Sequence, residues 1–142
     1  MRRAGRTVSR IVAAALLLAA AACALPMVTG VAHLETPLPG GLPLGNLLTA
    51  LVLCATAGAA VALVPPHTRL RTAAKLSLLA AVAWLPLSIA LAGNLALNFT
   101  GGRGTAWLVL SLAIVVVVLV TLAWALLANF AAALRELRLR NR

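Results

Sequence analysis

The sequence predicts an all-α membrane protein, a four-transmembrane-helix bundle with both termini in the cytoplasm. The first observation is composition, since 63% of the 142 residues are hydrophobic, 10% are charged and the mean hydropathy is +1.08. Soluble chains typically have ~45–50% apolar and ~25% charged residues. The second observation is the length of the uncharged stretches, and the third is the clustering of basic residues between them. A soluble globular domain is excluded because so short a chain buries too little surface, and disorder is excluded because it requires low hydrophobicity.

Four apolar runs are long enough to cross a membrane, which takes ~20 residues of helix. They comprise residues 11–32, 44–64, 73–97 and 105–133, and with basic tails at 1–10 and 134–142 they form a single integral membrane domain over 1–142. The spans are predicted to be helices, because an open strand leaves backbone groups unpaired in lipid. No run alternates with a period of two, as the strands of a membrane barrel do.

The first run supports two alternatives. Its basic start, its apolar stretch at 11–22 and the small residues before Cys23 resemble a secretory signal, which would leave three spans after cleavage. A cysteine at that place also loosely fits the lipidation pattern of bacterial lipoproteins, although Ala20 stands where Leu is usual. Because the apolar run continues past Cys23, we expect a retained helix, with cleavage before Cys23 and its lipidation as the alternative.

Small residues recur at every fourth position of the second run, at Ala50, Cys54, Gly58 and Ala62. This spacing places them on one helix face. A small face lets a neighbouring helix approach closely, which is how membrane helices associate without a hydrophobic driving force. We therefore expect a helix-packing face here, used within the bundle or by partner subunits.

The third and fourth runs differ in character. In the third run, small residues repeat at Ala73, Ser77 and Ala81 until Trp84 and Pro86 interrupt the repeat, and the proline is expected to kink the helix or to free a carbonyl. The fourth run carries the branched stretch 114–120, which favours a lipid-facing surface or a broad contact surface. Trp107 and Trp124 lie toward the two ends of this run, as an aromatic belt would place them. Pro and Gly are frequent in the connections between runs, where they break helices and permit turns.

The basic residues predict the orientation. Eleven of the twelve lie in the N-terminal tail, the second connection and the C-terminal tail, and Arg103 alone lies in the third connection. Because short cytoplasmic loops carry the excess of Lys and Arg, both termini are predicted to be cytoplasmic. The net charge of +10 then requires no nucleic-acid partner. The expected partners are anionic lipid headgroups, at ~1 kcal/mol per basic residue, and the alanine- and arginine-rich composition favours a bacterial plasma membrane.

Four polar or charged residues on the outer side are candidates for a polar path or for partner contacts: Glu35, Asn94, Asn98 and Arg103. Asn94 and Asn98 are expected one turn apart at the outer end of the third helix, where they would cap it, bond a neighbouring helix or line a pore mouth. Glu35 and Arg103 are expected in loops, either solvated or paired with each other. No ionisable residue falls at the centre of a predicted span, which argues against a proton pump or a voltage sensor.

The sequence lacks the residue patterns of common catalytic and metal sites. Its two acids, Glu35 and Glu136, are predicted on opposite sides of the membrane, and no nucleophile elbow, P-loop or His-Glu-x-x-His motif occurs. His33 and His67 are predicted ~30 Å apart across the hydrocarbon, so they cannot share a cofactor. We therefore expect no enzyme, cofactor or metal, and predict a non-enzymatic accessory, assembly or structural subunit of a larger membrane complex. The alternative is a small homo-oligomeric channel, pore or transporter.

Overall fold

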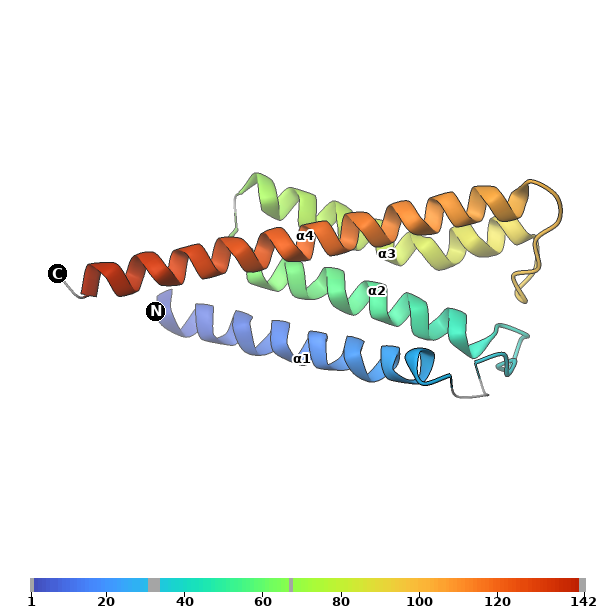
Figure 1. Ribbon diagram of the computed structural model, residues 1–142, viewed down its shortest axis with the longest axis horizontal. Helices are drawn as coiled ribbons and strands as arrows, with labels where there is room; N and C mark the ends of the chain where they lie inside the picture. Colours follow the sequence, from blue (N-terminus) through green and yellow to red (C-terminus); the bar gives the residue numbers. More distant parts are fainter. Residues whose placement is uncertain (1, 31–33, 67, 141–142) are drawn as a thin grey trace.

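The computed structural model describes residues 2–30, 34–66 and 68–140, which form four helices and no strand. The helices are α1 (Arg2–Val28), α2 (Leu44–Leu63), α3 (Arg69–Ala92) and α4 (Arg103–Arg140) (Figure 1). Each helix contains a stretch that is long and apolar enough to cross a membrane. The predicted all-helical, multi-pass architecture is therefore confirmed.

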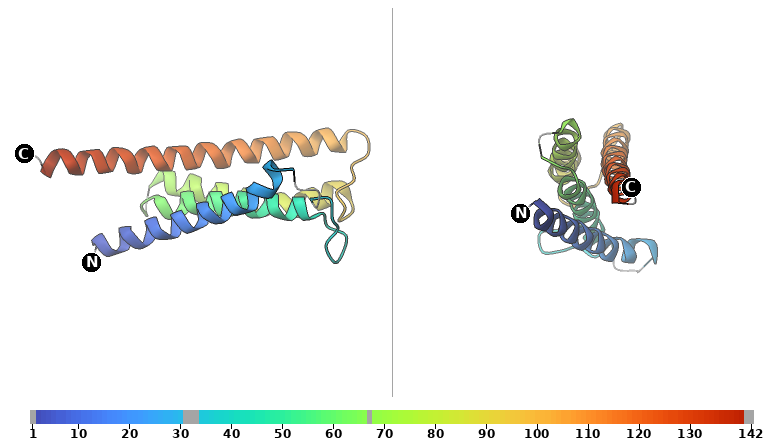
Figure 2. Two further views of the ribbon diagram at one scale, coloured as in Figure 1. Left: turned by 60° about the horizontal axis from the view of Figure 1, so that its bottom comes forward. Right: turned by 90° about the vertical axis from the view of Figure 1, so that its left-hand side faces the viewer.

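The central helix of the molecule is α2. It packs against α1, α3 and α4, and α3 also packs against α4, whereas α1 packs against α2 alone. The end-on view in Figure 2 shows α1 and α4 on different sides of α2. The fold is thus a three-helix core, formed by α2, α3 and α4, with α1 docked on the outer flank of α2. Both chain ends lie at the same end of the molecule as the α2–α3 connection (Figure 1).

Small residues build most of the three-helix core. The main buried cluster contains Ala50, Leu53, Ala57, Ala81, Trp84, Ile114 and Val118. A second cluster, nearer the α2–α3 connection, contains Ala60, Val64, Ala74 and Ala125. Alanine at a contact position lets two helix backbones approach closely, and van der Waals packing then holds the helices together in lipid.

Local capping sets both ends of α3. The hydroxyl of Thr68, the residue before the helix, accepts a hydrogen bond from the Arg71 N–H at 3.1 Å. Gly93 follows the helix with a φ of +73°, a left-handed conformation that ends helices and that glycine adopts at no steric cost. The third helix therefore covers 69–92 rather than the expected 73–97.

The first helix ends at Val28, just before Gly30, whose φ of +66° does not continue a helix. The expected end of this helix, residue 32, lies outside the described residues. Between the first two helices, the Leu38 N–H donates to the Leu42 carbonyl at 2.8 Å, which closes a compact turn in this connection.

Two helices extend past the core at the end where both termini lie. α1 begins at Arg2 and α4 continues to Arg140, so the segments expected as basic tails are largely helical. The Asn129 side chain marks the level at which α2 ends, because its Nδ2 donates to the Leu63 carbonyl at 3.0 Å. With a rise of 1.5 Å per residue, α4 projects about 16 Å beyond that level.

Candidate functional site

Asn94 and Asn98, which we predicted on the outer side, lie in the α3–α4 connection, not on α3. Asn94 Nδ2 donates to the carbonyls of Ala92 and Asn98, each at 3.2 Å, and Asn94 Oδ1 accepts from the Asn98 N–H at 3.1 Å. The Asn94 side chain therefore holds its own loop in shape. The expectation of two asparagines one turn apart on a helix is corrected, because Gly93 ends α3 before both of them.

The two outer charges, Glu35 and Arg103, are both exposed, and no ion pair joins these two described residues. Arg103 begins α4, and its Nη1 lies 4.0 Å from the position that a Cβ on Gly93 would take. The guanidinium is therefore close to the C-terminal end of α3. A cation is favourable there because the last carbonyls of a helix carry partial negative charge.

The predicted small face of α2 lies between the core and α1. Ala50 belongs to the main buried cluster and Cys54 packs against it. A Cβ added to Gly58 would lie 3.3 Å from Leu16 Cδ1, so the absence of a side chain at Gly58 lets α1 sit close to α2. Ala62 is half-buried. Cys23 and Cys54 are half-buried free cysteines on different helices.

An exchange of hydrogen bonds between tryptophan and serine joins α3 to α4. Trp84 Nε1, on α3, donates to Ser111 Oγ at 2.8 Å, and Trp107 Nε1, on α4, donates to Ser88 Oγ at 2.9 Å. The two indole rings lie 6.4 Å apart, and Phe99 stacks on Trp107 at 5.0 Å. The signal for this arrangement in the sequence is a Trp-x-x-x-Ser pattern, which occurs in each of the two helices.

Side chains from α3 and α4 complete the C-terminal end of α2. Arg71 Nη1 donates to the Val64 carbonyl at 2.7 Å and also to the Val61 carbonyl. Asn129 Nδ2 donates to the Leu63 carbonyl at 3.0 Å. The last carbonyls of a helix have no partner within the helix, so these two side chains satisfy groups that would otherwise be costly near lipid. Neither residue was predicted to act in this way.

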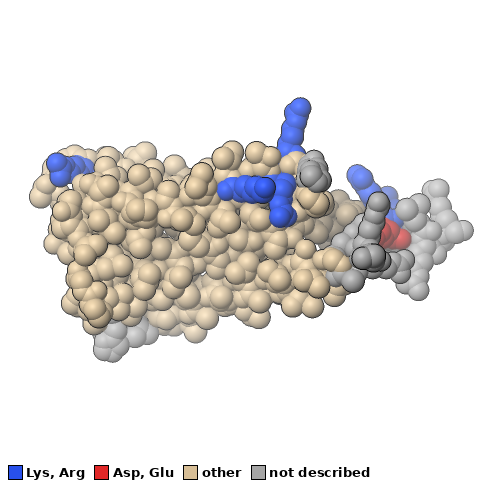
Figure 3. Space-filling model, turned by 180° about the vertical axis from the view of Figure 1, so that it is seen from behind, with Lys and Arg blue, Asp and Glu red and all other residues tan. Residues whose placement is uncertain are grey.

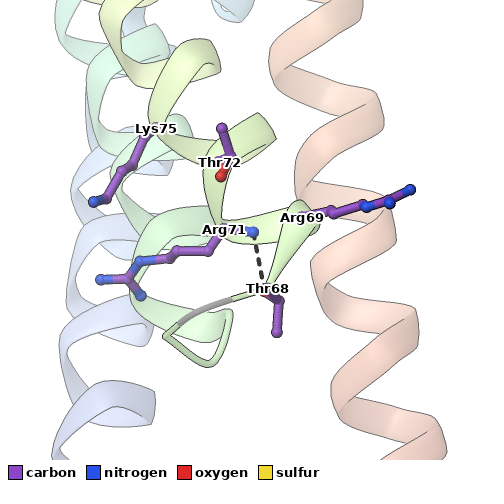
Figure 4. A pocket seen from close by; sticks show the side chains of 5 residues that line it. All are labelled: Thr68, Arg69, Arg71, Thr72 and Lys75. Atoms are coloured by element: carbon purple, nitrogen blue, oxygen red, sulfur yellow. Dashed lines mark hydrogen bonds between the residues drawn. The ribbon is translucent and has the colours of Figure 1, made fainter.

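A basic pocket of about 500 Å³ opens beside this helix end, and its lining residues are Thr68, Arg69, Arg71, Thr72 and Lys75. Figure 4 shows the side chains of Arg71 and Lys75 on one side of α3 and that of Arg69 on the other, toward α4. Figure 3 shows basic side chains gathered on the apolar body, with the one visible acidic side chain beyond them on the projecting end. Three of the described cations, Arg69, Arg71 and Lys75, therefore line one pocket.

The described residues bring together no group of three His, Cys, Asp or Glu side chains that could hold a metal. His33 and His67, which we considered as ligands, lie outside the described residues. Comparisons with protein-family models, curated proteins and solved structures found no match.

Proposed function

We propose that this protein is a non-enzymatic accessory, assembly or structural subunit of a larger membrane complex, and that α1 packs against a membrane helix of the partner. The supporting observation is the composition of the α1 surface. Ala15, Ala19 and Ala22 are exposed and share, by their spacing, the face opposite the buried Ala13 and Ala20. Small residues are concentrated where membrane helices meet.

The exposed surface of α4 provides the contrast. Between residues 108 and 127, the exposed alanines are Ala113 and Ala123, and the other exposed residues are Val, Leu or Trp. Bulky aliphatic side chains suit contact with lipid tails. In addition, α1 has one neighbouring helix, whereas each helix of the core has at least two. A partner helix seated on α1 would give it a second neighbour.

We further propose that both termini are cytoplasmic and that the membrane is a bacterial plasma membrane. The two chain ends and the α2–α3 connection lie at one end of the molecule (Figure 1). Eleven of the twelve basic residues lie near the two chain ends or in the first turns of α3, directly after this connection. This distribution supports the orientation through the excess of Lys and Arg in cytoplasmic segments. The alanine- and arginine-rich composition supports the bacterial assignment.

The test is the mass of the native particle, extracted from its own cells in mild detergent, with every co-purifying chain identified. The variant is Ala19→Leu, and the matched control is Ala113→Leu, which makes the same change on the exposed face of α4. We expect the parent and the control to retain a defined partner, and Ala19→Leu to lose at least nine-tenths of it.

A particle made only of copies of this chain would overturn the subunit proposal and favour the channel, pore or transporter. In that event, Asn94, Asn98, Glu35 and Arg103 become the residues to substitute in flux assays. The same mass decides whether residues 1–22 are retained or whether a lipid is attached to Cys23.

A further inference from the structure

The inner end of the bundle carries positive charge that the described residues do not balance. The described cations at this end are Arg10, Arg69, Arg71, Lys75, Arg135 and Arg138. The described acids are Glu136, on the projecting end of α4, and Glu35, in the connection at the opposite end of the molecule. The counter-charge for these cations therefore comes from outside the chain, either as mobile ions or as a bound anion.

Arg71 is fixed in position before any ligand arrives. Its Nη1 is held by the Val64 and Val61 carbonyls, which leaves its other guanidinium N–H groups available. Lys75 lies one helical turn further along α3, and its side chain points to the same side as that of Arg71 (Figure 4). Residues four apart on a helix are neighbours, so the two cations face one pocket.

The hydroxyl groups of the pocket differ in their availability. Thr68 Oγ1 donates to the Pro65 carbonyl at 3.1 Å and accepts from the Arg71 N–H at 3.1 Å, so it is already engaged. Within the described part of the chain, neither the Thr72 hydroxyl nor the Lys75 ammonium has a hydrogen-bond partner. Two cationic groups and one free hydroxyl are complementary to the oxygens of a phosphate.

The level of the pocket along the spanning helices indicates whether the phosphate belongs to a lipid or to a soluble molecule. The carbonyls that hold Arg71 belong to the last turn of a spanning helix and the residue after it, so the guanidinium lies at the edge of the hydrocarbon. Lys75 lies one turn deeper along α3, and a lysine there extends its long stem back toward the headgroups. A phosphate at this level belongs to a lipid.

We infer that Arg71, Thr72 and Lys75 bind the phosphate of an anionic phospholipid in the cytoplasmic leaflet. The headgroup supplies the counter-charge, and its glycerol and acyl chains lie along the apolar surface of α3. This inference does not rest on the partner subunit proposed above, since the site consists of residues of α3 alone. The two proposals can therefore fail separately.

The experiment titrates the purified full chain in detergent with phosphatidylglycerol, and counts retained lipid by native mass spectrometry. Phosphatidylcholine is the uncharged comparison. We expect Lys75→Gln to weaken retention of phosphatidylglycerol about fivefold, the factor for one basic residue at an anionic surface. Arg135→Gln is the matched control, because it removes one exposed positive charge at the same end of the molecule but outside the pocket, and we expect less than a twofold change.

Three outcomes would overturn the inference. An equal loss in the two variants would mean that the chain attracts anionic lipid only diffusely. Equal retention of phosphatidylcholine would mean that headgroup charge is not recognised. Displacement of the lipid by millimolar inorganic phosphate would assign the pocket to a soluble phosphate instead. Arg71 is left unchanged in these tests, because its substitution would also uncap α2.

Discussion

The two most exposed spans, α1 and α4, are held in the molecule by different kinds of contact. In the most apolar window, 11% of α1 and 17% of α4 are buried, against 28% in each of α2 and α3. Directional hydrogen bonds join α4 to α3 through Trp107 and Ser111, and to α2 through Asn129. The contact of α1 with α2 is a close approach at Gly58, with a weak hydrogen bond from Thr49 Oγ1 to Met27 Sδ at 4.0 Å.

This difference shows that exposure alone does not decide what a membrane helix does. Hydrogen bonds fix both the depth and the rotation of α4, so its exposed bulky face is left to the lipid. Van der Waals packing fixes the depth and rotation of α1 less specifically, because such contact is satisfied equally well by a partner of similar shape. The helix held mainly by packing is thus the one that we propose is shared with another protein.

We expect the largest loss of stability when the contact between α3 and α4 is disrupted. Trp84 is 2% exposed and donates to Ser111, so Trp84→Ala removes a large buried side chain and one hydrogen bond between α3 and α4. We expect a loss of about 3–5 kcal/mol in the free energy of unfolding. The measurement is reversible unfolding by sodium dodecyl sulfate in mixed micelles.

The matched control is Trp124→Ala on the exposed face of α4. Trp124 is 62% exposed, so its removal leaves no cavity, and we expect a loss below about 1 kcal/mol. If the two variants lose the same stability, the tryptophan–serine exchange does not hold α4, and the contrast with α1 disappears.

The spans could be predicted from the sequence because length and hydropathy are local properties. The predicted second helix, 44–64, differs from α2 by one residue. The ends of the third helix could not be predicted in the same way, because a single left-handed residue, Gly93, stops it within an apolar stretch. Pro86 lies inside α3, within the span where we expected it to kink the helix or to free a carbonyl.

The residues that join the helices were harder to predict, because their roles depend on the register between helices. Trp107 was expected in an interfacial belt, yet its Nε1 reaches Ser88 on the neighbouring helix. Arg71 was interpreted only as a topological charge, and its role as the cap of α2 exists because the chain turns back at once after Val64. Gly58 could be predicted as a packing residue from the spacing of small residues within its own helix, and the structure places Leu16 against it.

We expect a smaller loss of stability when α1 is separated from α2. Gly58→Leu places a side chain against Leu16, and we expect a cost of about 1–3 kcal/mol, confined to the contact between α1 and α2. The measurement is the yield of a disulfide between cysteines introduced at Met27 and Thr49, which are in contact, in a chain whose native cysteines are replaced by alanine. The yield is expected to fall while the unfolding of the core changes little.

The control for this prediction is Gly102→Leu, because nothing lies within 4 Å of a Cβ at Gly102. It should leave the disulfide yield unchanged. A loss of core stability as large as that of Trp84→Ala would contradict the prediction, since it would mean that α1 is an integral part of the core.

The smallest effect is expected where α4 meets the end of α2. Asn129→Leu keeps a side chain of similar size but leaves the Leu63 carbonyl without its donor, at an expected cost of about 1 kcal/mol. The cost stays small because Arg71 still holds the carbonyls on either side of Leu63. Asn98→Leu, in an exposed loop, is the control. A loss of stability above about 3 kcal/mol would mean that this single bond, rather than the tryptophan–serine exchange, distinguishes the attachment of α4 from that of α1.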